Sequence, residues 1–158
     1  TALRGACEQF VESRIREGEN LKLDLIEKLD GMLTDVAAIE KRSPEILQAY
    51  RTKLTEKVKE LLSDTQLEES RIATEVILYA DKICTDEETV RLHSHIESMK
   101  QTLQTGGSIG RKLDFIAQEM NREANTILSK ANDLETSNLA INLKTEIEKV
   151  REQIQNIE

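Results

Sequence analysis

The stretch from Gly110 to Lys130, GRKLDFIAQEMNREANTILSK, constrains the fold more than any other part of the chain. When it is placed on an α-helix at about 100° per residue, its apolar side chains fall on one face. That face holds Leu113, Ile116, Ala117, Met120, Ala124, Ile127 and Ala131. The spacing therefore predicts an amphipathic helix whose apolar face is buried in a core.

The opposite face of this helix is unusual for a face that meets only solvent. It holds Arg111, Asp114, Gln118, Asn121, Arg122, Asn125 and Ser129. Solvated faces are usually filled with Glu and Lys, which favour helix formation, whereas Asp, Asn and Ser are mediocre helix formers. Two interpretations stay open on periodicity alone. The polar groups either form a site on a rigid element, or they pack against a polar neighbour.

The composition of the whole chain favours helices. Of the 158 residues, 33% are charged and 3% are aromatic, with no Trp and one Pro. No segment shows the sustained alternation, rich in Val, Thr and aromatic residues, that indicates a strand. We therefore predict an all-α protein made of long helices. No apolar run approaches membrane-spanning length and no signal peptide opens the chain, so we expect no membrane partner.

Apolar periodicity predicts six helices along the chain. They cover residues 1–39, 44–62, 66–83, 85–103, 110–130 and 139–157. Ser43-Pro44 is interpreted as a helix start, because Pro is favoured at the first helical position. Thr85 followed by Glu88 is interpreted as a capping box.

The predicted helices suggest two parts. The first two should form a long antiparallel, coiled-coil-like hairpin over residues 1–64. The others should form a compact helical bundle over residues 65–158, which would be the catalytic-type domain. Cys7 and Cys84 have no metal or redox spacing and lie on apolar helical faces, so we expect reduced core residues in a cytosolic protein.

The net charge of −8 argues against nonspecific nucleic-acid binding, which depends on neutralising phosphates. A nucleic-acid ligand is still compatible with this charge in two ways. Arg and Lys can be concentrated locally, or carboxylates can hold metal ions that contact the phosphate.

The two histidines, His93 and His95, point about 200° apart on their predicted helix and cannot share a site. Glu88, Arg91 and His95 lie along one edge of the buried stripe, so His95 is the candidate metal ligand or general acid and base. A lone histidine at such an edge is more often a satisfied structural residue, and this interpretation stays open.

Three carboxylates stand out beside the polar face: Asp114, Glu119 and Glu123. Glu119 and Glu123 are four residues apart and like-charged, which destabilises a helix unless a cation lies between them. Mg²⁺ and Mn²⁺ favour such oxygen ligands. The alternative is that Arg122, Lys130 or neighbouring helices neutralise these carboxylates, as is usual for acidic pairs.

Several long strings resemble one known family. The stretch GRKLDFIAQEMNREANTILSK is followed by LKTEIEKVREQIQNIE from Leu143 to Glu158 and preceded by RLHSHI from Arg91. Together with RIREGENLK at residues 14–22, these strings resemble, in the same order, the C-terminal helical portion of the YicC-like (YicC/YloC) endoribonuclease family.

This resemblance implies a bacterial, cytoplasmic enzyme that hydrolyses phosphodiester bonds in single-stranded RNA with a divalent metal, Mn²⁺ or Mg²⁺. It also implies a ring-like homo-oligomer, a hexamer in the full-length family. Members of the family carry a further N-terminal domain. The chain starts at Thr1 without it, so we expect a fragment that cleaves RNA less efficiently than the full-length protein.

Pattern and resemblance together predict the roles of individual residues. The predicted catalytic residues are His95, Glu119, Glu123 and Asn121. The predicted substrate-binding residues are Arg14, Arg91, Arg111, Arg122, Asn125 and Lys130. The predicted metal ligands are Glu88, Asp114, Glu119 and Glu123. The alternative function is a noncatalytic helical adaptor or oligomerisation domain of an RNA-processing assembly, and a third is a purely structural coiled coil.

Overall fold

The computed structural model describes residues 1–62 and 69–157, and within these it contains five α-helices and no strand. The helices are α1 (Ala2–Leu61), α2 (Glu69–Ile83), α3 (Asp86–Thr105), α4 (Gly110–Lys130) and α5 (Leu134–Ile154). The all-α prediction is therefore confirmed. Among the described helices, none combines the length and apolarity needed to cross a membrane.

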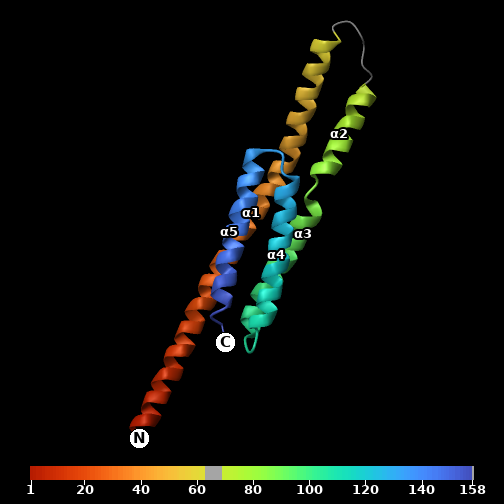
Figure 1. Cartoon of the computed structure of the whole chain (residues 1–158). Coiled ribbons are helices and arrows are strands. Elements are labelled where there is room, and N and C mark those ends of the chain that lie inside the picture. The colour runs from red at the N-terminus through yellow and green to blue at the C-terminus, as the bar shows by residue number, and fades with distance from the viewer. Residues whose placement is uncertain (63–68, 158) are drawn as a thin grey trace.

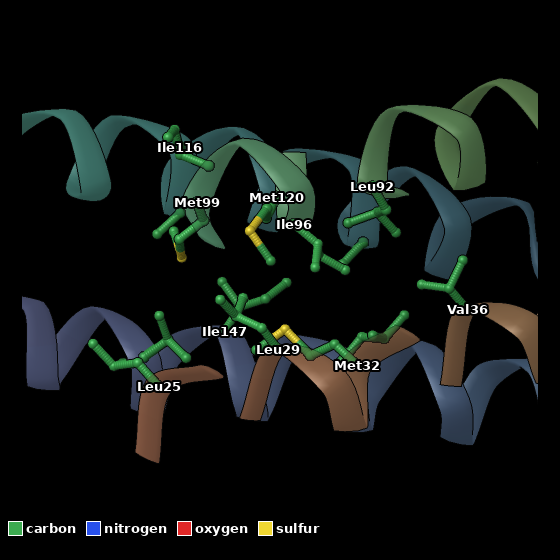
Figure 2. Close-up of a cluster of buried hydrophobic side chains, with 14 of the residues drawn as sticks. Leu25, Leu29, Met32, Val36, Leu92, Ile96, Met99, Ile116, Met120 and Ile147 are labelled. Atoms are coloured by element: carbon green, nitrogen blue, oxygen red, sulfur yellow. The ribbon is translucent and has the colours of Figure 1, made fainter. Parts of the chain in front are cut away.

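Four of these elements form an antiparallel bundle (Figure 1). The middle of α1 packs beside α3 and α5, and α4 completes the arrangement by packing against the same two helices. Figure 2 shows the core between the two layers, where Leu92 and Met120 of the α3–α4 layer face Leu29, Met32 and Ile147 of the α1–α5 layer. The bundle therefore holds one continuous apolar core.

The predicted amphipathic helix is α4, and its bounds are those of the stretch that the periodicity singled out. Leu113, Met120 and Ile127 are completely buried, together with Ala117 and Ala124. Burying one large apolar side chain stabilises the fold by roughly 1.5–3 kcal/mol. The inner face of α4 is therefore fixed by the core, and this orientation determines where its polar side chains point.

The predicted helix break at Ser43-Pro44 is wrong, because α1 continues through Pro44. At 60 residues it is about 90 Å long. A proline inside a helix removes one hydrogen bond and costs roughly 3 kcal/mol. Pro44 lies on an exposed side of α1, where water can reach the carbonyl that loses its partner. Buried residues from Leu25 to Ile39 anchor the helix just before this point.

A hairpin does project from the bundle, but its arms differ from those predicted. The C-terminal part of α1 packs against α2, not against residues 1–39 (Figure 1). The rings of Tyr50 and Tyr79 stack across this hairpin with centroids 3.8 Å apart. The predicted boundary between residues 64 and 65 and the predicted helix start at Gln66 lie outside the described residues.

The N-terminal end of α1 extends beyond the bundle (Figure 1). Leu3 and Phe10 are 80% and 67% exposed, so the apolar face expected to be buried here is not covered by the described part of the chain. Cys7 and Cys84 are both exposed, and the prediction that they are core residues is wrong. Periodicity marked an apolar face at Cys7, but no helix lies beside it. Cys84 falls in the short break between α2 and α3.

A glycine-rich turn reverses the chain between α3 and α4. Gly106 and Gly107 have φ values of 69° and 84°, in the left-handed region that glycine adopts without strain. Gly110 opens α4 at a close approach, since a Cβ atom there would lie 3.2 Å from the carbonyl oxygen of Ile157. The turn therefore allows α4 to start beside the end of the chain.

Asp133 caps α5 and ties it to α1. Its carboxylate accepts a hydrogen bond from the Thr136 backbone N–H at 3.2 Å and lies 3.3 Å from Arg42 Nε. Burial raises the pKa of Asp133, but hydrogen bonding by Thr136 and Arg42 outweighs this effect and lowers the pKa below its ordinary value. The cap explains why α5 begins at Leu134, five residues before the predicted start at Leu139.

Candidate functional site

Ion pairs join α3 and α4 along one edge of their contact. Lys130 Nζ lies 2.7 Å from Glu88 Oε1. About one turn further along α3, Arg91 Nη1 lies 3.5 Å from Glu123 Oε1, and Arg91 also pairs with Glu87. We call this edge the α3–α4 seam and define it by Glu88, Arg91, His95, Glu119, Glu123 and Lys130. These contacts bring four of the predicted site residues together, and His95 and Glu119 follow on the same sides of α3 and α4.

The predicted capping box at the start of α3 is not formed. Thr85 is the N-cap residue but makes no side-chain capping hydrogen bond. Glu88 is 4% exposed and pairs with Lys130, which also donates to the Cys84 carbonyl at 2.9 Å. The Glu88 carboxylate that the capping box would use is therefore held by Lys130 in a charge-assisted hydrogen bond. Glu88 Oε2 is buried and has no hydrogen-bond partner among the described residues.

His95 and Glu119 lie about one helical turn further along the seam than Arg91 and Glu123. Arg91 opposite Glu123 sets the antiparallel register, and four residues on from Arg91 this register places His95 level with Glu119. Both are half-buried, and neither has a hydrogen-bond or ion-pair partner among the described residues. An imidazole and a carboxylate that lie side by side, next to carboxylates that already have basic partners, can act as a proton donor and a proton acceptor.

His93 lies on another side of α3. Its Nε2 atom lies 3.2 Å from Glu40 Oε1 on α1, whereas Arg91, on the same edge as His95, contacts α4. The prediction that the two histidines cannot share a site stays a prediction, and the contact of His93 with α1 is consistent with it. His93 therefore fits the structural role that is usual for a helix-edge histidine.

The outermost side of α4 carries a second group of predicted residues. We call this side the outer ridge and define it by Arg111, Phe115, Gln118, Arg122 and Asn125, all exposed. Within the described residues, the side chains of Arg111 and Arg122 form no ion pair or hydrogen bond. In a chain with a net charge of −8, two arginines without a carboxylate partner make this ridge locally positive.

The other border of α4 faces α5 and behaves as packing. Asp114 Oδ1 lies 3.3 Å from Arg151 Nε, and Gln118 Nε2 donates to Asp114 Oδ2 at 2.7 Å. Asn121 is half-buried in a groove of about 530 Å³ that α4 and α5 line, beside Lys144. The structure therefore does not bring Asp114 and Asn121 together with His95 and Glu119. Their predicted metal and catalytic roles stay predictions.

Arg14 is also remote from the seam. It lies on the part of α1 that extends beyond the bundle and pairs with Glu17 at 3.8 Å. It lines a groove of about 810 Å³ between α1 and the turn that contains Gly106 and Gly107. Its predicted role in substrate binding stays a prediction.

The predicted metal ligands do not converge on one point. Among the described residues, no group of three or more His, Cys, Asp or Glu side chains could together hold a metal ion. Glu88 and Glu123 are held by Lys130 and Arg91, and Asp114 is held on the α5 side. The side chains therefore do not fit an all-protein cage. They fit only an ion that takes one or two carboxylates and completes its shell with water and substrate phosphate, as Mg²⁺ commonly does.

Comparison with known proteins gives the family. A family model described as "Endoribonuclease YicC-like, C-terminal" matches residues 39–158. The chain belongs to this family. The "Probable endoribonuclease YicC" of Clostridioides difficile (strain 630) is 46% identical over 158 residues, which cover 99% of this chain and 54% of the relative. The protein of the same name from Haemophilus influenzae is 37% identical, covering 100% of this chain and 54% of the relative.

The chain thus spans about half the length of these curated YicC relatives. The seam and the outer ridge both lie inside the region that the YicC-like model matches. Sequence reasoning missed three residues around them: Glu87 and Arg151, which neutralise predicted site residues, and Phe115 on the ridge. Phe115 could have been found, because it falls one turn after Arg111 and two turns before Arg122.

Proposed function

We propose that this chain is the RNA-cleaving part of a metal-dependent endoribonuclease whose reaction takes place at the α3–α4 seam. Membership of the YicC-like endoribonuclease family supports the reaction class. The location rests on His95 and Glu119, which lie level with each other and have no hydrogen-bond or ion-pair partner among the described residues. The carboxylates beside them, Glu123 and Glu88, are already paired with Arg91 and Lys130.

The proposed reaction is hydrolysis of a phosphodiester bond in single-stranded RNA. Glu119 accepts a proton from the attacking water, whose oxygen bonds to phosphorus. His95 donates a proton to the departing ribose oxygen as the P–O bond breaks. Positioned acid and base groups of this kind contribute roughly 10²–10⁴-fold to a rate. Arg91, which pairs with both Glu123 and Glu87, offsets part of the negative charge of the neighbouring seam.

A divalent cation, when bound, would neutralise charge on the phosphoryl oxygens. Glu119 and Glu123 are the residues we assign to it, because they are one helical turn apart and adjoin the proposed reaction centre. Two carboxylates and several waters make a weak site. We therefore expect activity to depend on added Mn²⁺ or Mg²⁺.

The active form is proposed to be a homo-oligomer of the full-length protein. The apolar residues left exposed on α1 outside the bundle support this proposal. Leu3, Phe10, Val11 and Ile15 are 80%, 67%, 54% and 62% exposed. Contiguous apolar surface of this kind is typical of an interface.

The test is cleavage of a fluorophore- and quencher-labelled single-stranded RNA by a protein of the relatives' full length. His95→Gln and Glu119→Gln should each slow cleavage about 100-fold or more, and EDTA should abolish it. His93→Gln is the matched control, since it changes the other histidine of the same helix, and it should stay within about twofold of wild type. Equal rates for His95→Gln and His93→Gln would overturn the site, and full activity in EDTA would overturn the metal requirement.

A further inference from the structure

Phe115 is one of only two phenylalanines in the chain, and 62% of its surface is exposed. An aromatic ring usually contributes most when it is buried, and the bundle core gains nothing from a ring on this side of α4. Single exposed apolar residues are common and need no special role. The neighbours of Phe115 therefore decide what the ring can do.

Those neighbours are cations and amides. Arg111 lies one turn before Phe115, Gln118 one turn after it, and Arg122 two turns after it, all on the exposed side of α4. Within the described chain, neither arginine has a carboxylate partner. The nearby Asp114 is already paired with Arg151.

This combination has the chemistry of a single-stranded nucleic-acid contact. Arginine binds phosphate through several N–H donors, and an aromatic ring stacks against any base because every base has a π-face. Arg111 and Arg122 are eleven residues apart, or about 16 Å along the helix, and the ring lies between them. The positive charges of Arg111 and Arg122 are complementary to the phosphate backbone of a nucleic acid and not to an apolar protein surface.

We propose that Phe115 is a stacking platform for one base of single-stranded RNA, with Arg111 and Arg122 binding the phosphates on either side of it. This inference rests on the proposed function and adds the residue that positions the substrate. Glu119 lies one turn after Phe115 on α4. A strand lying on the outer ridge therefore passes next to the part of the seam that holds His95 and Glu119.

The test uses the protein at the relatives' full length and an unstructured oligouridine substrate, with KM and kcat measured separately. Phe115→Ala should raise KM about tenfold or more, equivalent to about 1.4 kcal/mol, and change kcat by less than about twofold. Phe115→Trp should restore the wild-type KM, because tryptophan stacks on bases. Phe115→Leu should not restore it, because leucine is apolar but has no π-face. Ile77→Ala, at an apolar side chain of α2 that is 61% exposed, is the matched control and should leave KM unchanged.

A second readout uses the absence of tryptophan from the 158-residue chain. RNA should quench the fluorescence that Phe115→Trp adds, and it should not quench that of Ile77→Trp. All these variants should keep the melting temperature of the wild type within a few degrees, because the substituted side chains are exposed.

The outcomes separate the two proposals. If the wild type neither binds nor cleaves RNA, the proposed function fails. If it cleaves RNA and Phe115→Ala has the same KM as Ile77→Ala, the function stands and the stacking platform is overturned. A change of oligomeric mass in Phe115→Ala, with unchanged KM, would also overturn it and would assign the ring to a protein contact.

Discussion

On the inner face of α4, Leu113, Met120 and Ile127 are completely buried, whereas on the outer ridge Arg111, Phe115 and Arg122 are exposed. The two faces belong to one helix and have the same backbone geometry, so the difference lies in what surrounds them. The inner side chains stabilise the fold through burial. The side chains of Arg111 and Arg122 make no hydrogen bond or ion pair within the described residues. Stability and function should therefore be separable by substitutions on opposite sides of α4.

The largest expected effect is on the inner face. Met120→Ala removes a completely buried side chain and should lower the free energy of unfolding by about 2–5 kcal/mol. Urea unfolding measures this. An unfolding free energy within about 0.5 kcal/mol of wild type would contradict the central place of Met120 in the core, and any loss of RNA cleavage should follow the loss of folded protein.

The second-largest loss of stability is expected at the α3–α4 seam, which lies between the inner face and the outer ridge. Lys130→Ala leaves the 4%-exposed Glu88 without its cation and should cost about 2 kcal/mol. This is less than the roughly 3–5 kcal/mol of a fully buried pair, because the Lys130 side chain keeps about one-third of its exposure. Lys149→Ala is the matched control. Its partner Glu146 lies on the same helix and Lys149 is 53% exposed, so its effect should be below about 0.5 kcal/mol. Equal effects of the two substitutions would show that the seam pair contributes nothing.

A smaller effect is expected at the start of α5, where Asp133 acts through both its cap and its charge. Asp133→Ala should cost about 1 kcal/mol, whereas Asp133→Asn keeps a capping side chain and should cost less. The pKa of Asp133 is lowered in the folded protein. Its ionised form therefore stabilises the fold above the unfolded pKa of about 3.9, and this contribution is lost as the pH falls through the folded pKa.

Urea unfolding of wild type and Asp133→Asn across this pH range measures the charge contribution. The difference in unfolding free energy between the two proteins should be constant near neutral pH and should shrink as the pH falls below about 3.9. A difference that persists unchanged to the lowest pH would show that the negative charge of Asp133 is not its source.

Sequence periodicity predicted the inner face of α4 because burial on a helix is a local, repeating pattern. The rule that places Pro at a helix start failed at Pro44, because packing on either side keeps α1 continuous there. The capping-box rule failed at Glu88. The capping box requires only Thr85, three residues away, whereas the observed partner Lys130 lies 42 residues along the chain. The Arg151 partner of Asp114 was missed for the same reason. Periodicity identifies faces, but partners between helices depend on the register of the bundle.

The most direct test of the separation between the two faces is the melting temperature and the RNA cleavage rate of Arg122→Ala, measured together at the relatives' full length. The melting temperature should stay within a few degrees of wild type, because surface substitutions usually change stability by less than about 0.5 kcal/mol. The cleavage rate should fall about tenfold or more, equivalent to about 1.4 kcal/mol of transition-state stabilisation. Arg51→Ala, at an exposed arginine on the projecting part of α1, should change neither quantity. An Arg122→Ala protein that melts early and keeps wild-type specific activity where folded would contradict the account, because the outer ridge would then be packing.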